Sequence, residues 1–286
     1  MSHALTPEQA IALIPDWRHA DVLVEGALEG LTNRSFRVRS GTDQFVLRLD
    51  AAHTSALRLD RAAEQIAIER AYAAGIGAEV VYSDPERGIL VTRYVPGRSL
   101  AQADLTDASV LEAVAALLRR LHALPELGTG FDIQTTAKGY LASLPDDSDM
   151  RRGGEVLVTM IEAQVSNAPT SFCHNDVIAA NFVLPGPNAD SLVLIDWEYA
   201  GDNDAYFDLA SLIAYNQLDA RSMDTLLGAY FGEVAAVDRA RLAAQIRNYN
   251  ALYWLWLAAC EAVTPSVSQR ETLEQLRKAI ESPSSG

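Results

Sequence analysis

The chain has 286 residues and a formal net charge of −15 at pH 7. This acidic balance argues against a protein that binds nucleic acid, because such proteins normally carry a basic face. No apolar run approaches the roughly 18 residues of a membrane-spanning helix, and the start of the chain lacks a secretion-signal pattern. Its two cysteines, Cys173 and Cys260, suit neither a disulfide framework nor a cysteine zinc site, so we expect a cytoplasmic protein.

The acidic residues are unevenly distributed along the chain. Residues 1–96 have a net charge of −3 and contain no lysine, whereas residues 97–286 have a net charge of −12. The second part of the chain therefore suits a cationic ligand or a bound metal ion.

Residues 1–96 are predicted to form a five-stranded sheet with one helix between the third and fourth strands. The segment from Thr6 to Gln9 carries a capping pattern that begins a short helix before the sheet. Apolar residues alternate on both sides of a turn at residues 41–43, which favours a hairpin. A helix is predicted from Asp60 to Ala74, and the last two strands flank a turn at residues 85–88.

Residues 97–286 are predicted to be mainly helical. A long amphipathic helix is expected at residues 109–124, where apolar residues recur every three or four positions. Residues 125–152 are rich in Gly, Pro, Asp and Ser, and we interpret them as loop with one short helix at residues 138–144.

Two short buried strands follow, at residues 171–176 and 191–197, and they are expected to flank a turn at residues 185–188. The pattern is helical from Tyr206 onward. One long helix is expected at residues 238–262.

The two buried strands lead into residues with the right chemistry for phosphoryl transfer. Asp176 follows the first strand, Asn181 lies five residues later, and the second strand ends in Asp196. Phosphoryl transfer from ATP needs a carboxylate beside the acceptor hydroxyl and oxygen ligands for Mg²⁺. Asp176 is therefore the candidate catalytic base, and Asn181 and Asp196 are the candidate metal ligands.

This pattern, HND-x4-N followed by LIDWEYAG, resembles the choline/ethanolamine kinase family within the aminoglycoside-phosphotransferase-like kinases. The resemblance covers most of the chain. It implies an α+β, protein-kinase-like fold with a small β-rich N-lobe at residues 1–96 and a larger, mainly helical C-lobe at residues 97–286. It also implies ATP and Mg²⁺ as cofactors, and a small cationic alcohol, choline or ethanolamine, as the substrate.

On the third strand, Arg48 is similar to the family's phosphate-binding residue, and Glu64 is similar to its partner on the helix. The general kinase pattern has a lysine on this strand, and this chain departs from it. Arginine keeps the positive charge and adds a bidentate fork, but it is bulkier than lysine. A kinase of weakened or lost activity is therefore an open alternative.

The resemblance also assigns the residues around the nucleotide. Thr32 and Asn33 belong to the segment that is similar to the phosphate loop, although the usual glycine pattern is missing. Tyr94 and Val95 stand where the hinge backbone would meet adenine. Asp208 looks like an acid at a helix start that buttresses the catalytic loop.

The acceptor pocket is expected to be aromatic. Tyr253 and Trp256 are three residues apart and share one face of the long helix, whereas Trp254 points elsewhere. Together with Trp197 they are candidates for binding a quaternary ammonium group, which aromatic faces attract. Glu198 is expected to add charge attraction, and the alternative that these aromatic rings belong to the core stays open.

Other functions also remain open from the sequence. The segment IDWEYA fits a thiamine kinase almost as well, whereas an aminoglycoside kinase usually needs a wide acidic cleft without an aromatic cage. A nucleotide-binding pseudokinase is a further alternative, against which the intact Asp176, Asn181 and Asp196 argue. The sequence gives no indication of the oligomeric state.

Overall fold

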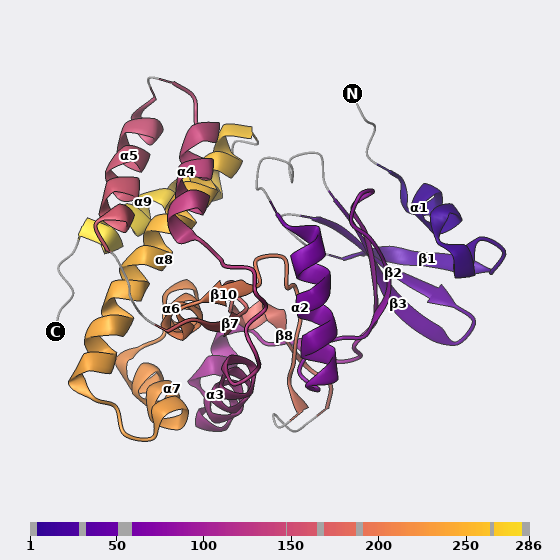
Figure 1. Ribbon diagram of the computed structural model, residues 1–286, viewed down its shortest axis with the longest axis horizontal. Coiled ribbons are helices and arrows are strands. Elements are labelled where there is room, and N and C mark those ends of the chain that lie inside the picture. Colours follow the sequence, from indigo (N-terminus) through magenta and orange to yellow (C-terminus); the bar gives the residue numbers. More distant parts are fainter. Residues whose placement is uncertain are drawn as a thin grey trace.

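The protein folds into a sheet-containing N-lobe and a larger helical C-lobe, which lie side by side (Figure 1). The structure is a computed structural model, and it describes residues 5–28, 33–50, 59–146, 148–164, 169–186, 191–263 and 266–281. The predicted α+β, protein-kinase-like fold is confirmed. A lobe boundary after residue 96 remains a prediction.

The N-lobe contains the predicted five-stranded antiparallel sheet. In the spatial order β1-β2-β3-β5-β4, its strands are β1 (Val22–Leu28), β2 (Asn33–Ser40), β3 (Asp43–Asp50), β5 (Ile89–Arg93) and β4 (Val80–Asp84). Helix α2 (Arg61–Ala73) lies between β3 and β4 in the sequence, and Asp60 caps its first turn. The predicted hairpin is confirmed by the pairing of Ser40 with Asp43.

A short helix covers one face of this sheet. Helix α1 (Pro7–Leu13) begins with the predicted capping box, in which Thr6 and Gln9 exchange hydrogen bonds of 2.8 and 3.3 Å. The following 3-10 turn, η1 (Pro15–Trp17), places Trp17 edge-on against Phe45 with ring centroids 5.3 Å apart. These contacts form a small core that is separate from the main core of the protein.

Helix α2 connects the N-lobe to the C-lobe. Its buried residues Ala67, Ile68 and Ala71 belong to the main hydrophobic core, not to the small core under α1. Just beyond the helix, the carbonyl of Ile76 accepts a backbone hydrogen bond of 2.8 Å from Leu194 in the C-lobe. The helix is therefore packed against the C-lobe while it also belongs to the lobe that carries the sheet.

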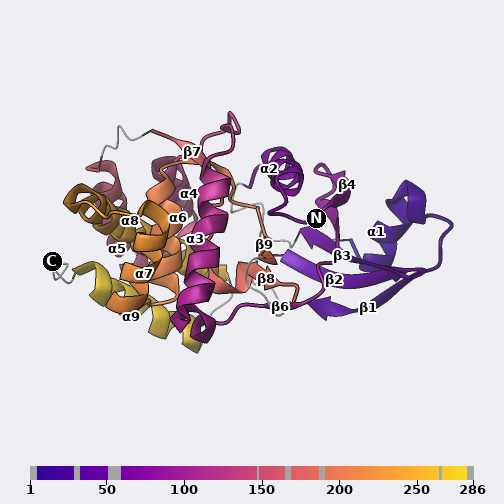
Figure 2. The ribbon, with the colours of Figure 1, turned by 90° about the horizontal axis from the view of Figure 1, so that it is seen from below.

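The C-lobe consists mainly of helices, which gather on one side of the molecule in Figure 2. They are α3 (Ala108–His122), α4 (Ile133–Ser143), α5 (Asp149–Glu162), α6 (Ala205–Tyr215), α7 (Ala220–Phe231), α8 (Ala236–Val263) and α9 (Val267–Glu281), with 3-10 turns η3 (Gln102–Thr106) and η4 (Ala179–Asn181). The long helices predicted at residues 109–124 and 238–262 correspond to α3 and α8. No helix in the described part of the chain is long and apolar enough to cross a membrane.

Short strands of the C-lobe lie near the junction with the N-lobe. One group has the order β6-β8-β9, formed by β6 (Arg98–Ser99), β8 (Phe182–Leu184) and β9 (Val193–Leu194). The other pairs β7 (Ser171–Cys173) with β10 (Gly201–Asn203). Along the chain, β7 is followed by the loop at residues 174–178, then by η4, β8 and β9.

Two predictions for the C-lobe were wrong. Residues 125–152 are not mainly loop, because α4 is longer than the predicted helix and α5 begins at Asp149. The turn at residues 185–188 is flanked by β8 and β9, whereas β7 pairs with a strand that the sequence did not indicate. Part of that turn, residues 187–190, lies outside the described residues.

Candidate active site

The loop between β7 and η4 is held from below by Asp208 of α6. Asp208 is fully buried, and its carboxylate accepts the backbone N–H groups of His174 at 2.9 Å and Asn175 at 2.7 Å. Asn175 has a φ of 65°, in the left-handed region that few non-glycine residues adopt. Asp208 thus stabilises an unusual turn immediately before Asp176, and the expected buttressing role is confirmed.

His174 and Trp197 lie beneath this loop, in the core. The Nε2 atom of His174 lies 3.0 Å from the carbonyl of Ile195, and its Nδ1 accepts the backbone N–H of Asp176 at 3.3 Å. Trp197 is 1% exposed, packs edge-on against His174, and donates its indole N–H to Leu194. The prediction that the Trp197 ring contacts the substrate needs correction, because the ring is enclosed in the core.

Asp176 and Asn181 are connected directly. The side-chain amide nitrogen of Asn181 lies 2.9 Å from the backbone carbonyl of Asp176 and 3.3 Å from its carboxylate. If Asn181 holds a metal ion as predicted, its amide oxygen is the ligand atom, because the amide nitrogen is a donor. Burial, and then the charge of Glu198, raise the pKa of Asp176 to about 7.

Asp196 also has an unusual backbone conformation, and the pKa of its carboxyl group is shifted. Its φ is 67°, and its side chain is 42% exposed inside the cleft between the lobes. Partial desolvation by the walls of the cleft, and then the charge of Glu198, raise the pKa of Asp196 above its ordinary value. Water that reaches this side chain screens part of the effect. The carboxylate of Asp196 and the amide oxygen of Asn181 are oxygen donors of the kind that Mg²⁺ prefers, and both residues line this cleft.

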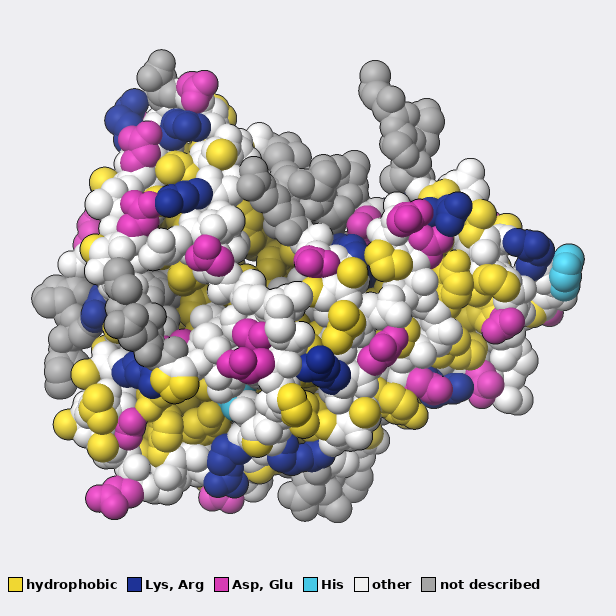
Figure 3. Space-filling model, viewed as in Figure 1, with side chains coloured by type: hydrophobic (Ala, Val, Ile, Leu, Met, Phe, Trp, Pro, Cys, Tyr) yellow, Lys and Arg dark blue, Asp and Glu magenta, His cyan; other side chains and the backbone are white. Residues whose placement is uncertain are grey.

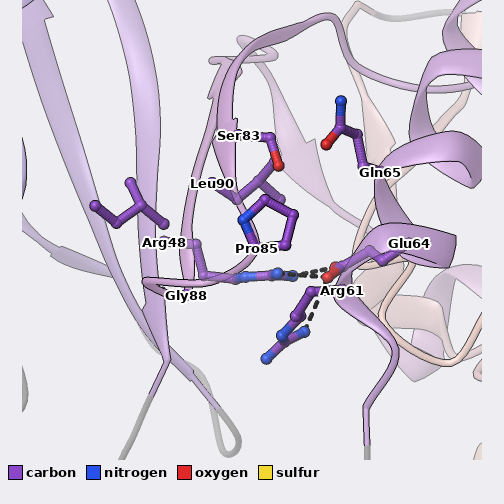
Figure 4. Close-up of a pocket in the computed structure, with 9 residues that line it drawn as sticks. Arg48, Arg61, Glu64, Gln65, Ser83, Pro85, Gly88 and Leu90 are labelled. Carbon is purple, nitrogen blue, oxygen red and sulfur yellow. Dashed lines mark hydrogen bonds and ion pairs between the residues drawn. The ribbon is translucent and has the colours of Figure 1, made fainter. Parts of the chain in front are cut away.

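Across the cleft, Arg48 of β3 pairs with Glu64 of α2, as predicted. Both Nη atoms of Arg48 bond the carboxylate oxygens of Glu64, and the Nη2–Oε2 distance is 2.6 Å (Figure 4). Arg48 is 8% exposed and Glu64 is 2% exposed, so the two charges compensate each other away from bulk water. The Nη1 atom of Arg48 also lies 4.0 Å from Asp196.

Glu198 does not face the solvent as a free anionic group. Its side chain is 2% exposed, and Oε2 accepts the Asn33 amide N–H at 2.7 Å. The same oxygen lies 3.3 Å from Nη1 of Arg61. These contacts hold the Glu198 carboxylate against the N-lobe, although its negative charge still raises the pKa values of Asp176 and Asp196. Its role in attracting a cationic substrate remains a prediction.

The hinge between the lobes has fewer free backbone groups than expected. Tyr94 donates its backbone N–H to the carbonyl of Gln44 at 3.0 Å. For the predicted contact with adenine, this pairing leaves the carbonyl of Tyr94 and the backbone of Val95. Thr32, which was predicted to meet the phosphates, lies outside the described residues.

A cleft of about 1010 Å³ connects these groups. The hinge residues Tyr94 and Val95 line one part of it, and Tyr253 and Trp256 line another. Asp176 also lines this cleft. On the face shown in Figure 3, the acidic side chains are scattered among Lys and Arg, so the net charge of the C-lobe forms no single patch there.

The aromatic end of the cleft is built on α8. Tyr253 stacks on Trp256 and on Tyr249, with ring centroids 5.9 and 6.0 Å apart, which confirms the predicted shared face. The indole N–H of Trp256 donates to Tyr199 at 3.1 Å. Trp254 points away, as predicted, and is buried against α9.

Comparison with known proteins agrees with this geometry. The family model described as "Phosphotransferase enzyme family" matches residues 24–245. The chain belongs to the phosphotransferase enzyme family. It is a small-molecule kinase, as the sequence predicted.

Similar proteins act on more than one acceptor. Protein LicA of Haemophilus influenzae is 28% identical over 256 residues, which cover 83% of this chain and 74% of that protein. The thiamine kinase of Salmonella paratyphi B is 29% identical over 257 residues, 87% of this chain and 84% of that protein. A solved choline/ethanolamine kinase family protein from Mesorhizobium loti has a TM-score of 0.75 and 26% identity, covering 96% and 93% of the two chains.

Several residues of this phosphotransferase site were missed by the sequence reasoning. Arg61 stands three residues before Glu64 at a helix start, which was an available but unspecific signal. Tyr140 and Tyr215 line the aromatic end of the cleft, and they come from α4 and α6. Nothing in their local sequence distinguishes them from ordinary core tyrosines.

Proposed function

We propose that this kinase transfers the γ-phosphoryl group of ATP to the hydroxyl of a small cationic alcohol, most simply choline or ethanolamine. The observation that carries the proposal is the continuity of the cleft. The same cleft is lined by the Arg48–Glu64 pair, by Asp176 and by the stacked rings of Tyr253 and Trp256. A nucleotide and a cationic alcohol can therefore share one cavity that is also lined by the carboxylate of Asp176.

In this proposal the chain's own residues divide the chemistry. Asp176 accepts the proton of the acceptor hydroxyl while the hydroxyl oxygen bonds to the γ-phosphorus and ADP leaves. A pKa of about 7 suits such a base near neutral pH. Arg48 binds the phosphates, and Asn181 and Asp196 hold Mg²⁺, which when bound neutralises charge on ATP.

The aromatic end of the cleft favours a cation over a neutral sugar. Ring faces attract quaternary ammonium groups by about 0.5–2 kcal/mol each. Tyr215, Tyr249, Tyr253 and Trp256 offer such faces, and the Tyr215 and Tyr253 centroids lie 5.5 Å apart. Burial, and then the negative charge of Asp176, raise the pKa values of Tyr215 and Tyr249. These two side chains therefore interact electrostatically with the proposed base.

Thiamine is the second candidate acceptor. The similarity to a thiamine kinase extends over 87% of the chain, and thiamine also combines a cationic ring with a primary alcohol. Aromatic faces suit that ring as well as a quaternary ammonium group. The acceptor must therefore be decided by turnover.

The test is ADP release by the purified protein with MgATP and each of choline, ethanolamine, thiamine and kanamycin. We expect turnover with choline or ethanolamine and a loss of turnover in Asp176→Asn. Turnover with thiamine alone would keep the kinase chemistry and replace the acceptor. Tight binding of a non-hydrolysable MgATP analogue without turnover on any acceptor would instead support the pseudokinase alternative.

A further inference from the structure

Arg61, the first residue of α2, is a buried arginine behind the wall of the cleft. Its side chain is only 10% exposed. Among the described residues, Arg61 does not line the large cleft. Three of its partners do line it: Asn33, Glu64 and Glu198. Arg61 is therefore placed to act on the site through other side chains.

The guanidinium of Arg61 bonds all three of these partners. Nη2 donates to the amide oxygen of Asn33 at 2.8 Å, and Nη1 donates to Glu64 at 2.9 Å and to Glu198 at 3.3 Å. A fourth carboxylate, Asp50 at the end of β3, lies 2.6 Å from Nη2. One side chain thus connects β2, β3, α2 and the segment that follows Asp196.

Each partner belongs to a different part of the nucleotide site. Asn33 begins β2 and belongs to the segment predicted to cover the phosphates. Glu64 orients Arg48, and Figure 4 shows Arg61 beside that pair with its dashed contact to Glu64. Glu198 stands two residues after Asp196, the proposed metal ligand, and lines the same cleft.

The three contacts also close a ring between the lobes. The amide nitrogen of Asn33 donates to Glu198 at 2.7 Å, and its amide oxygen accepts a hydrogen bond from Arg61. Arg61 also donates to Glu198, which completes the ring. Buried carboxylates are costly unless they are paired, and Glu64 and Glu198 both have side chains that are 2% exposed. The flat fork of a guanidinium bonds several partners in fixed directions, whereas a lysine ammonium is a point charge on a flexible stem.

We propose that Arg61 is a positioning residue that holds Asn33, Glu198 and the Arg48–Glu64 pair in the geometry that receives the phosphates of ATP. This role rests on the proposed function, because it assumes that the nucleotide binds in the cleft. It concerns only the phosphate half of the site. The stacked rings of α8 are connected to Arg61 only indirectly, because Trp256 bonds Tyr199, the residue after Glu198. Acceptor binding should therefore depend on Arg61 far less than nucleotide binding does.

The test is Arg61→Lys, which keeps the charge and removes the fork. We expect the KM for MgATP, and the Kd of a non-hydrolysable MgATP analogue measured by calorimetry, to rise about 10- to 100-fold, the range for losing hydrogen bonds to buried charges. The KM for the acceptor should stay within about twofold. Arg70→Lys is the matched control, because Arg70 lies on the same helix and bonds the carbonyls of Pro125 and Glu126 instead.

A double variant separates positioning from general destabilisation. If Arg61 acts through Asn33, Arg61→Lys combined with Asn33→Ala should bind the analogue nearly as well as the weaker single variant, because the two losses overlap. Equal changes in both KM values with a lower melting temperature would overturn the proposal, and so would a nucleotide Kd within about twofold of wild type. Binding of the analogue by wild-type protein without turnover would contradict the proposed function alone, since the binding comparison still tests Arg61.

Discussion

Arg48 and Asp196 face each other across the cleft, with Nη1 and Oδ1 4.0 Å apart. Arg48 comes from the sheet of the N-lobe, and Asp196 follows the last strand of the β6-β8-β9 group. The residue proposed to bind phosphate is therefore adjacent to the residue proposed to bind the metal. A metal-bound triphosphate between them would meet positive charge on one side and oxygen ligands on the other.

The first prediction concerns the arginine that replaces the usual lysine. Arg48→Lys keeps the charge but loses the two-point contact with Glu64, so we expect the KM for MgATP to rise about tenfold. Arg48→Gln, which also removes the charge, should lower kcat/KM for MgATP about 100-fold or more. Steady-state kinetics with varied MgATP measure both. A fully active Arg48→Lys would show that the fork geometry is unnecessary.

The second prediction distinguishes the base from the metal ligand. Asp176→Asn should lower kcat by about 10²–10⁴-fold while the nucleotide still binds, because the proton acceptor is lost and the ligand atoms remain. Asp196→Asn should abolish the part of nucleotide affinity that depends on Mg²⁺. Calorimetry of a non-hydrolysable analogue, with Mg²⁺ and with EDTA, makes the comparison. Near-full turnover in Asp176→Asn would mean that another group accepts the proton.

The third prediction concerns the pH dependence of the ligand-free protein. The pKa of Asp176 is about 7 in the folded protein and about 4 in an unfolded chain, so the folded state binds the proton more tightly. Its contribution to stability is present below about pH 4 and is lost as the pH rises through about 7. In EDTA, the melting temperature should therefore fall between pH 5 and pH 8.

The control for this pH effect is Asp176→Asn, which cannot ionise. Its melting temperature should exceed that of wild type by a few degrees at pH 8, since about 1 kcal/mol changes the melting temperature of a chain of this size by about 2–4 °C. The difference between the two proteins should shrink toward pH 5. Parallel melting curves over this range would show that Asp176 is not destabilised by burial.

The sequence predicted the features of the fold that depend on neighbouring residues. The capping box at Thr6 and Gln9, the hairpin after Ser40 and the helix capped by Asp60 each arise from side chains within a few positions of one another. The first part of helix α4, residues 133–137, was missed because this segment is polar and only Ala137 and Tyr140 are buried in the whole helix. Its packing against α5 and α8, rather than its own pattern, stabilises it.

In the candidate site, too, the sequence predicted the residues of a local motif but not the contacts between residues far apart in the chain. Asp176, Asn181 and Asp196 lie within one contiguous motif, so their types and spacing were visible in the sequence. Arg61 and Glu198 are 137 residues apart, and no local pattern reports their contact. Trp197 was misplaced for a related reason: the sequence shows an aromatic ring beside the motif, but burial decides whether that ring faces a ligand or the core.

The fourth prediction tests the stacked rings as a cation site. Trp256→Leu and Tyr253→Leu should each raise the KM for choline about 3- to 30-fold, the range of a lost cation–π contact, with the KM for MgATP unchanged. The neutral isostere 3,3-dimethylbutan-1-ol should be a poor substrate of wild type and should be less affected by these variants. Trp254→Phe is the control, because the Trp254 indole is buried and bonds Leu273. Equal losses for choline and the isostere would indicate simple packing.

The last prediction concerns the glycine that follows the hinge. Gly97 has a φ of 143°, and a Cβ atom there would lie 2.3 Å from the carbonyl oxygen of Leu184, which no side-chain rotation can relieve. Gly97→Ala should therefore lower the melting temperature by several degrees and weaken MgATP binding, because β6 must move away from β8 beside the hinge. Gly228→Ala is the matched control: it lies in α7 with open space around it, and alanine there should stabilise the helix by about 1 kcal/mol or less. If Gly97→Ala melts like wild type, the close approach of the hinge to β8 does not occur in solution, and the position of Val95 at the nucleotide end of the cleft would have to be reconsidered.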